Sequence, residues 1–536
     1  MINSLIIVLC AFNLLSVHSV PSSVNSFELA IVHVNDFHAR FEESNEWGGQ
    51  CDKKEKCIGG FSRMYQTIET LKKNNPNILL LNAGDNFQGT VWYNIFKWNV
   101  TQHFLNKIPF DAYTLGNHEF DDNVDNAVQY MKHLKAPVVL ANVNDSLESS
   151  FQGLYKKSIV VERGGKKIGL IGVLLTEVMV KARIGKLKFF DESESINAEA
   201  ERLVKEHNVF TNIIISHCGY ELEQDMAKKA RGKISVIVGG HTHSLLWTGD
   251  NPPSHAEKPE GPYPTVVQNK AGKNILVLQA QSFARYVGNI RVQYNSVGEV
   301  THWSGSPIFQ TSSLPQNPKI TAELMTWKES LDVEVDKKLG ESLTELSNAM
   351  IFNGMSSGIP SEYATVSLVN SGALKESIQR GNITYRKILD ASPFTNDIVV
   401  GHIRGKFLLE ALEHALEYFA EWRSRLLQVS GLKVTYDFTK PEGKRVKYVQ
   451  VRCFKCSVPK YSDLQPNANY NVVTLDFLTL GGDGFSMLRD NFVTTRIGST
   501  LIDSLVQYVK KKSPVWSEIE GRITVIGDGH IKSNYR

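Results

Sequence analysis

Side chains that bind metal ions recur in the first half of the chain, each time directly after a short apolar run. Five such clusters occur, and each contains Asp, Asn or His. The candidate ligands are Asp36, His38, Asp85, Asn117, His217, His241 and His243. A short apolar run bounded by turn residues is typical of a buried strand, and α/β proteins place reactive groups at the carboxyl ends of strands. The pattern therefore predicts one site assembled from five strand ends.

The ligand set indicates the kind of metal and the chemistry. It offers oxygen and nitrogen atoms without thiolate, which suits two divalent cations such as Zn, Mn or Fe, with Ca as a further candidate. We expect Asp85 to bridge the two ions. Two ions about 3.5–4 Å apart clamp the attacking and leaving oxygens of a phosphoryl transfer. A single His after a strand is usually a capping or surface residue, so the prediction rests on the recurrence of the cluster.

An alternation of strands and helices must position these clusters. We predict strands at residues 29–34, 78–81, 112–115, 138–140, 168–173, 213–215, 234–238 and 275–278. We predict helices at residues 61–72, 126–134, 198–206 and 221–229. This alternation indicates an α/β architecture of stacked sheets covered by helices.

The length of the chain predicts more than one domain, because 536 residues exceed what one hydrophobic core usually organises. The first domain is predicted at residues 27–314. Residues 315–339 carry apolar side chains at spacings of three and four, which predicts an amphipathic connecting helix. The second domain is predicted at residues 340–536. The chain contains no internal repeat and no low-complexity tract.

The net charge and the terminal segments indicate the partners and the cellular compartment to expect for the protein. The formal net charge of +3 gives no reason to expect nucleic acid or an anionic membrane as a partner. Residues 1–19 resemble a signal peptide, although their first residues lack Lys and Arg; a buried first strand or helix is the alternative. No later run is predicted to span a membrane, and the polar last residues are unlike a GPI signal. The expected product is secreted, without a membrane anchor.

The cysteines fit an oxidising compartment. Cys51 with Cys57 and Cys453 with Cys456 are expected to form local disulfides, and Cys218 is expected to be free. The second pair is a CxxC motif, for which half of a zinc site or a redox motif is the alternative. Three sequons for N-glycosylation occur, at Asn99, Asn144 and Asn382.

Taken together, the motifs resemble those of the secreted and membrane-anchored ecto-5′-nucleotidases and the related salivary apyrases of blood-feeding arthropods. The segments that carry the resemblance are residues 34–38, 83–90, 115–121, 239–243 and 477–485. It implies a calcineurin-like metallophosphoesterase β-sandwich flanked by helices at the N-terminus. It also implies a C-terminal α/β 5′-nucleotidase domain that holds the nucleoside and rotates to bring phosphate to the metals.

The resemblance also implies roles for single residues. One metal would be held by Asp36, His38, Asp85 and His243, and the other by Asp85, Asn117, His217 and His241. His118, paired with Asp121, would stabilise the transferring phosphoryl group and assist the leaving oxygen. A carboxylate keeps an imidazole oriented and favours its protonated form, which makes this pairing physically reasonable.

In the second domain, the resemblance implies a nucleotide site with two stacking aromatic rings. Phe477 and Phe394 would enclose the base, and Asp483 would accept hydrogen bonds from the ribose hydroxyls. Stacking tolerates any base and predicts broad nucleotide specificity. Asn370 and Lys375 match the ends of a substrate-binding loop that ends in arginine in the family, and lysine replaces that bidentate fork with a point charge.

Two further differences from the family pattern concern Cys218 and residues 339–364. Cys218 follows His217 where the family often has serine, and a small buried thiol should be tolerated there. The stretch 339–364 is much shorter than its family counterpart and lacks a nucleotide-contacting arginine and two disulfides. The predicted metal site is therefore complete, whereas the predicted nucleotide site is reduced.

Three functional hypotheses follow. The leading one is a secreted, metal-dependent hydrolase of extracellular ATP, ADP or AMP, with an anti-platelet role if the source is saliva. The rival is a nucleotide- or receptor-binding inhibitor of haemostasis with little turnover, which the reduced nucleotide site favours. The third is a phosphoesterase for non-nucleotide substrates. The substrate preference, the native metal and the oligomeric state are left open by the sequence.

Overall fold

The structure is a computed structural model of the whole chain. It describes residues 27–45, 51, 57–176, 178, 184–249, 252–253, 258–344, 346, 365–374, 377–392, 396–417, 425–453, 456, 458, 460–516 and 521–527. The predicted signal peptide and most of the shortened stretch 339–364 lie outside these residues, as do Lys375 and Phe394.

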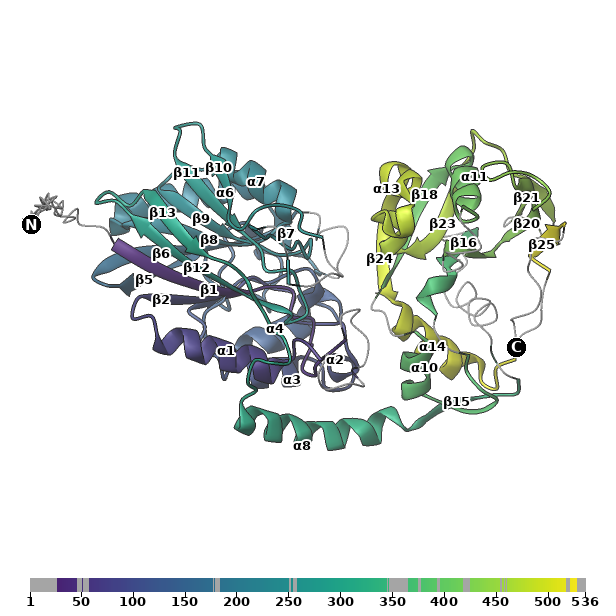
Figure 1. Ribbon diagram of the computed structural model, residues 1–536, viewed down its shortest axis with the longest axis horizontal. Helices are drawn as coiled ribbons and strands as arrows, with labels where there is room; N and C mark the ends of the chain where they lie inside the picture. Colours follow the sequence, from purple (N-terminus) through teal and green to yellow (C-terminus); the bar gives the residue numbers. More distant parts are fainter. Residues whose placement is uncertain are drawn as a thin grey trace, which may run out of the picture.

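Among the residues that the structure describes, the first domain contains two six-stranded sheets that face each other (Figure 1). The first has the order β13-β12-β1-β2-β3, and β14 also pairs with β12. The second has the order β10-β11-β9-β8-β6-β5. The bounds of the first sheet are β1 (Phe27–Val34), β2 (Ile78–Asn82), β3 (Ala112–Tyr113), β12 (Tyr286–Tyr294), β13 (Val300–Gly305) and β14 (Ile308–Phe309). The bounds of the second are β5 (Ser158–Arg163), β6 (Lys166–Leu174), β8 (Thr211–His217), β9 (Ile234–Val238), β10 (Thr265–Gln268) and β11 (Asn274–Leu278).

Helices cover the outer faces of both sheets (Figure 1). On the first sheet they are α1 (Phe61–Lys73), α2 (Val91–Phe96), α3 (Trp98–Leu105) and α4 (Val124–His133). On the second they are α6 (Glu192–His207) and α7 (Tyr220–Lys228). The central strands are buried along their whole length because the facing sheet covers one side and helices cover the other. A short pair, β4 (Val143–Asn144) with β7 (Lys188–Phe189), lies outside both sheets.

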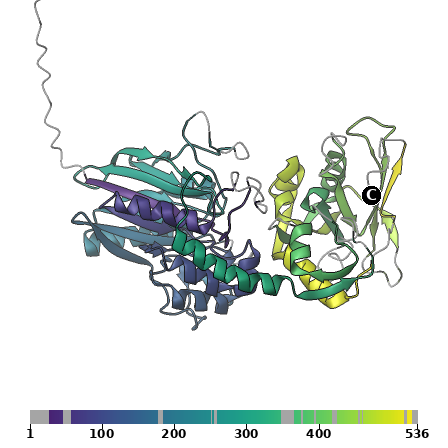
Figure 2. The same ribbon diagram turned by 60° about the horizontal axis from the view of Figure 1, so that its bottom comes forward.

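Helix α8 (Pro318–Val335) connects the domains along one side of the molecule (Figure 2). The helix is bound to the first domain as far as Lys328: Glu323 pairs with His103 and Lys107, and Lys328 pairs with Glu42. Its last turn is bound to the second domain by ion pairs of Arg386 with Asp332 (3.0 Å) and Asp336 (2.7 Å). The helix is therefore held at both ends by different domains.

The second domain contains a five-stranded sheet of order β19-β16-β23-β18-β24 and a four-stranded sheet of order β22-β21-β20-β25. The five-stranded sheet comprises β16 (Val366–Asn370), β18 (Asp397–Arg404), β19 (Leu427–Ser430), β23 (Asn469–Leu475) and β24 (Val493–Thr500). The four-stranded sheet comprises β20 (Leu432–Asp437), β21 (Val446–Arg452), β22 (Tyr461–Asp463) and β25 (Ile523–Ile526). β15 (Lys338–Ser342) pairs with β17 (Gly381–Thr384) near the connecting helix. The helices are α10 (Tyr385–Ala391), α11 (Gly405–His414), α12 (Asp476–Thr479), α13 (Ser486–Asn491) and α14 (Leu501–Lys512).

The predicted α/β fold class is confirmed, whereas one predicted strand and two element boundaries are corrected. The predicted strand 138–140 is wrong: Val138 and Val139 make only isolated bridges, to Tyr113 and Lys156. The strand predicted at 112–115 ends at Tyr113, because the chain turns toward the site. Helix α6 begins six residues before the predicted start, at Glu192, because the Asp191 side chain accepts a hydrogen bond from the backbone of Glu194 and caps the helix.

The cysteine pairing agrees with the sequence. Cys51 is bonded to Cys57 and Cys453 to Cys456, and Cys218 is free and buried. Within the described part of the chain, no helix combines the length and apolar character that crossing a membrane requires.

The N-terminal cap of α8 provides a stability test. The Asn317 side-chain oxygen accepts hydrogen bonds from the backbone of Lys319 and Ile320, while its amide donates to Gln66. Replacing Asn317→Ala removes both functions and should lower the free energy of unfolding by about 1 kcal/mol. Asn317→Asp retains the capping oxygen and should lower it less. Equilibrium denaturation measures both, and equal losses would contradict the capping role.

Candidate active site

The predicted ligands meet where the two sheets of the first domain bring their carboxyl ends together. Strands β1, β2 and β3 are parallel neighbours in one sheet, and β8 and β9 are parallel neighbours in the other. The loops after β1 and β2 are bonded backbone to backbone, through Asp36 N–H to Gly84 O and His38 N–H to Asp85 O, both at 3.0 Å. Side chains distant in sequence thus share one edge of the sandwich.

The backbone at this edge is unusually constrained. Five of the seven predicted ligands have φ between 50° and 79°, namely Asp36, His38, Asp85, His241 and His243. Positive φ costs free energy in non-glycine residues and clusters at functional sites, where surrounding structure maintains it. Gly116 has a different constraint: a Cβ there would lie 2.0 Å from Asp85 Oδ1, so only glycine fits.

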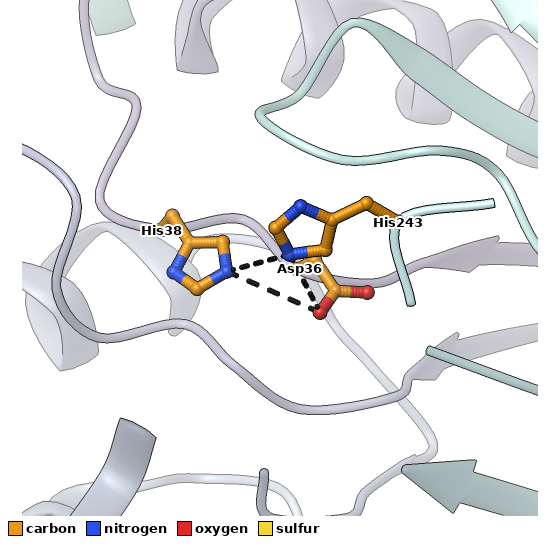
Figure 3. A group of neighbouring side chains, drawn as sticks. All are labelled: Asp36, His38 and His243. Atoms are coloured by element: carbon orange, nitrogen blue, oxygen red, sulfur yellow. Dashed lines mark hydrogen bonds and ion pairs between the residues drawn. The ribbon is translucent and has the colours of Figure 1, made fainter. Parts of the chain in front are cut away.

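The first cluster consists of Asp36, His38 and His243 (Figure 3). The Nε2 atoms of the two imidazoles are 3.1 Å apart, and Asp36 Oδ1 lies 3.4 Å from His243 Nε2 and 4.0 Å from His38 Nε2. Asp36 and His38 are buried, whereas His243 is partly exposed. Three potential ligand atoms thus converge on one point from two different loops.

The second cluster consists of Asp85, His217 and His241. Asp85 Oδ2 lies 3.0 Å from His217 Nε2 and 3.9 Å from His38 Nε2, so this carboxylate lies between the two clusters. The Asn117 side-chain oxygen lies 2.9 Å from His241 Nδ1. A third group, His38, Asp85 and His118, links the first two, because it shares His38 with one and Asp85 with the other. All seven predicted ligands therefore lie in one continuous cluster.

The donor set fits bound cations. The Nδ1 of His38 lies 3.0 Å from Phe87 O, and the Nδ1 of His217 lies 2.7 Å from Ala83 O, so in the neutral imidazoles these nitrogens donate. The Nε2 lone pairs then face carboxylate oxygens, an arrangement that is repulsive unless positive charge lies between them. Carbonyl groups that orient ligating imidazoles in this way are typical of metal sites.

The electrostatics indicate the same demand for positive charge. Burial lowers the pKa of His38 to about 3, which leaves its imidazole neutral and able to bind a metal. Burial also opposes charge on His217, but Asp85 and Asp36 outweigh it and raise the pKa of His217 to about 9. In turn, His217 and His118 outweigh burial and hold the pKa of Asp85 well below its ordinary value.

His118 and Asp121 form the predicted pair beside these clusters. His118 Nδ1 lies 2.7 Å from Asp121 Oδ2, and the His118 backbone N–H donates to Asp85 Oδ1 at 2.9 Å. Burial opposes charge on His118, but Asp121 and Asp85 raise its pKa well above the ordinary value. The two carboxylates therefore favour the protonated imidazole, and its Nε2 is on the side of the ring away from Asp121.

Glu119 is a functional candidate that the sequence reasoning missed. Its fully buried carboxylate accepts four backbone hydrogen bonds, from Gly116 (2.5 Å), Asp85 (3.0 Å), Asn86 (2.6 Å) and Phe87 (3.3 Å). Burial and the charge of Asp85 raise its pKa to about 7. One carboxylate thus joins the loop that carries Asp85 to the loop that carries Asn117. The signal in the sequence that could have identified Glu119 is its position among the predicted site residues.

Two other supporting side chains were also missed. The Asn35 amide donates to Asp36 Oδ2 (2.7 Å) and to Gln281 O (2.5 Å), which orients the carboxylate. Glu223 lies behind the other edge of the site, where it accepts hydrogen bonds from Ser216 (3.0 Å) and the backbone of Gly240 (3.2 Å). Burial raises the pKa of Glu223 to about 7. Glu223 lies in helix α7 and its partners lie in β8 and after β9, so no pattern within one element marks it.

The second domain brings together part of the predicted nucleotide site. Asn370, at the end of β16, donates to Asp483 Oδ2 at 3.0 Å, while its own side-chain oxygen is buried without a hydrogen bond from any described residue. Phe477 lies in α12 and is 36% exposed, so its ring is available for stacking. Phe394 and Lys375 lie outside the described residues.

One carboxylate of the second domain reaches the first domain's site and a second one holds it there, which the sequence did not predict. Asp397 Oδ2 lies 3.8 Å from His118 Nε2. Asp476 Oδ1 accepts hydrogen bonds from the backbone N–H of Asp397 (3.1 Å) and of Phe477 (2.7 Å). Burial raises the pKa of Asp397 well above its ordinary value, and His118 opposes this. Nearby, the Asn94 amide donates to the Tyr385 hydroxyl across the same interdomain boundary.

Comparison with known proteins agrees with this arrangement. Residues 29–245 match the family model of calcineurin-like phosphoesterases, and residues 334–490 match that of the 5′-nucleotidase C-terminal domain. An apyrase from Tabanus yao is 43% identical, covering 95% of this chain and 97% of the relative. A 5′-nucleotidase from Homo sapiens is 32% identical, covering 96% and 93%. The crystal structure of a 5′-nucleotidase precursor from Thermus thermophilus has 31% identity and a TM-score of 0.63, covering 94% of this chain and 100% of that one.

The sandwich, the potential metal ligands at its strand ends and the match to the family model define a metallophosphoesterase, a class whose members use divalent metal ions. With its second domain and its similarity over nearly the whole length of these relatives, the chain belongs to the 5′-nucleotidase family. The potential oxygen and nitrogen ligands indicate the class of ion, divalent cations.

Glu119 can be tested through metal binding. Replacing Glu119→Gln keeps the shape but puts an amide donor where two pairs of backbone N–H groups need acceptors. The affinity for Zn²⁺ or Mn²⁺ should fall about 10- to 100-fold, the range for residues that support metal ligands. Titration calorimetry of the apo protein measures this, and Glu329→Gln on the exposed face of α8 is the matched control. Equal affinities for both variants would contradict the role of Glu119.

Proposed function

We propose that this protein is a secreted hydrolase that uses two divalent metal ions to remove phosphate from extracellular nucleotides, with ATP, ADP and AMP as the candidate substrates. The observation that carries the proposal is the pair of adjacent His/Asp clusters, which Asp85, His38 and His118 link. The resemblance to apyrases and 5′-nucleotidases supports nucleotides as the substrate class. An anti-platelet role through removal of ADP is the expected consequence in saliva.

In the proposed mechanism, each residue has a separate task. Asp36, His38, Asp85 and His243 would hold one ion, and Asp85, Asn117, His217 and His241 the other. Bound ions of this type polarise phosphoryl oxygens and lower the pKa of water. The new bond joins a water oxygen to phosphorus, and the bond to the leaving oxygen breaks in line with it.

His118 would act on the same phosphoryl group. Its protonated Nε2 donates a hydrogen bond to a phosphoryl oxygen as negative charge develops, and its proton is available for the leaving oxygen. Asp121 keeps the ring in the orientation that presents Nε2, through the 2.7 Å bond to Nδ1. Asp121 is thus a positioning residue in the proposal.

Recognition of the nucleoside would fall to the second domain. Phe477, with Phe394, would stack on the base, and Asp483 would accept the ribose hydroxyls while Asn370 keeps that carboxylate in place. Lys375 would add a single positive charge. The choice between ATP, ADP and AMP depends on how this domain presents the phosphate chain to the metals.

A substrate panel tests the proposal directly. Purified full-length protein should release phosphate from at least one of ATP, ADP and AMP when supplied with Zn²⁺, Mn²⁺ or Ca²⁺. Chelation should abolish the release, and the readdition of metal should restore it. A generic phosphoester serves as the comparison, and equal activity on it would favour a phosphoesterase without nucleotide preference. No release under any condition, with nucleotide binding intact, would support the binding-protein hypothesis instead.

The role of His118 predicts a specific pattern in variants. His118→Ala should lower kcat about 10²- to 10⁴-fold, the usual contribution of a positioned acid or base, while metal content stays at two ions. Asp121→Asn should lower kcat less, because the imidazole remains. Steady-state kinetics and metal analysis of the same preparations measure this. A His118→Ala protein with the parent kcat would refute the assignment.

A further inference from the structure

The space beside the His118 Nε2 atom contains a carboxylate from the other domain. Asp397, the first residue of β18, brings Oδ2 to 3.8 Å from that nitrogen, and its side chain is 14% exposed. Nδ1 of the same ring is bonded to Asp121, so Nε2 is the atom left to meet an anion. In the proposed mechanism, this is where a phosphoryl oxygen belongs.

The position of Asp397 is maintained by its surroundings. Its backbone N–H donates to Asp476, and it pairs with Thr500 in the adjacent strand β24. The Asn94–Tyr385 hydrogen bond provides a second contact between the domains. The contact with His118 therefore belongs to a defined docked arrangement of the two domains.

We propose that Asp397 occupies the phosphoryl position beside His118 in the substrate-free protein, and that the phosphate of a substrate must displace it. This inference rests on the proposed function, which assigns the phosphoryl group to that position. A carboxylate resembles phosphate in presenting anionic oxygens to the His118 Nε2 atom, 3.8 Å away, but it carries less charge and makes fewer hydrogen bonds. Phosphate can therefore displace the Asp397 carboxylate, but this competition lowers the apparent affinity for phosphate.

The link to the nucleotide site runs through Asp476. One oxygen of this carboxylate accepts the N–H groups of both Asp397 and Phe477. The backbone N–H groups of the blocking residue and of Phe477 thus share one acceptor, which joins the start of β18 to the start of α12.

The energetic consequence is a reduction in affinity rather than in chemical rate. A protein whose binding-competent state is only partly populated binds its ligand more weakly by that fraction. Removing the blocking carboxylate should therefore strengthen phosphate binding and lower KM. The step from bound substrate to product occurs after Asp397 has left, so kcat should change little.

The test compares Asp397→Asn and Asp397→Ser with the parent protein, all metal-loaded and full-length. The dissociation constant of inorganic phosphate, measured by calorimetry, should fall about two- to fivefold in both variants, the scale of a partly exposed ion pair. KM for the best nucleotide should fall similarly, with kcat within about twofold. Asp490→Asn is the matched control, since Asp490 is an exposed carboxylate of the same domain that pairs with its neighbour Arg489.

Other outcomes would overturn the inference. They are unchanged or weaker phosphate binding in both variants, no phosphate binding in any protein, and a large loss of kcat at constant KM, which would make Asp397 part of the chemistry. Thermal unfolding identifies a variant that fails to fold, and the second substitution then decides. Because phosphate binding needs no turnover, a parent protein that hydrolyses no nucleotide would refute the proposed function while the binding comparison still judges Asp397.

Discussion

The site depends on one electrostatic constraint: buried carboxylates and imidazoles are held so close together that they require positive charge among them. Asp85 is at the centre of it. Its oxygens lie 3.0 Å from His217 Nε2 and 2.9 Å from the backbone nitrogen of His118. Without cations, charged imidazoles must supply the compensation, as the raised pKa of His217 indicates. Bound divalent ions would supply the positive charge that these carboxylates need. Metal binding should therefore stabilise this edge of the sandwich.

Much of the first domain could be predicted because its strands are short apolar runs that end in chemically distinctive residues. Asp36, Asp85, Asn117, His217 and His241 each follow such a run, and burial on both faces makes the runs continuously apolar. The strand at 138–140 was wrongly predicted because three apolar residues pack as well in a bridge-forming loop as in a sheet. Short apolar runs do not distinguish these environments.

The supporting residues could not be predicted, because their function exists only in three dimensions. Glu119 joins two loops through backbone N–H groups, which no side-chain pattern encodes. Asp397 is separated from His118 by 279 positions and belongs to another domain. Sequence periodicity reports which face of an element is buried, but not which distant loop meets it. Contacts of this kind become visible only in the folded chain.

The two-ended attachment of α8 has a mechanical consequence. Ion pairs hold the helix to the first domain as far as Lys328 and to the second domain from Asp332 onward. A single turn of helix lies between these two attachments. A rotation of one domain against the other would twist that turn or break the ion pairs of Arg386 with Asp332 and Asp336. Exposed ion pairs of this kind are weak and are screened by salt. The attachment of the end of α8 to the second domain should therefore weaken as ionic strength rises.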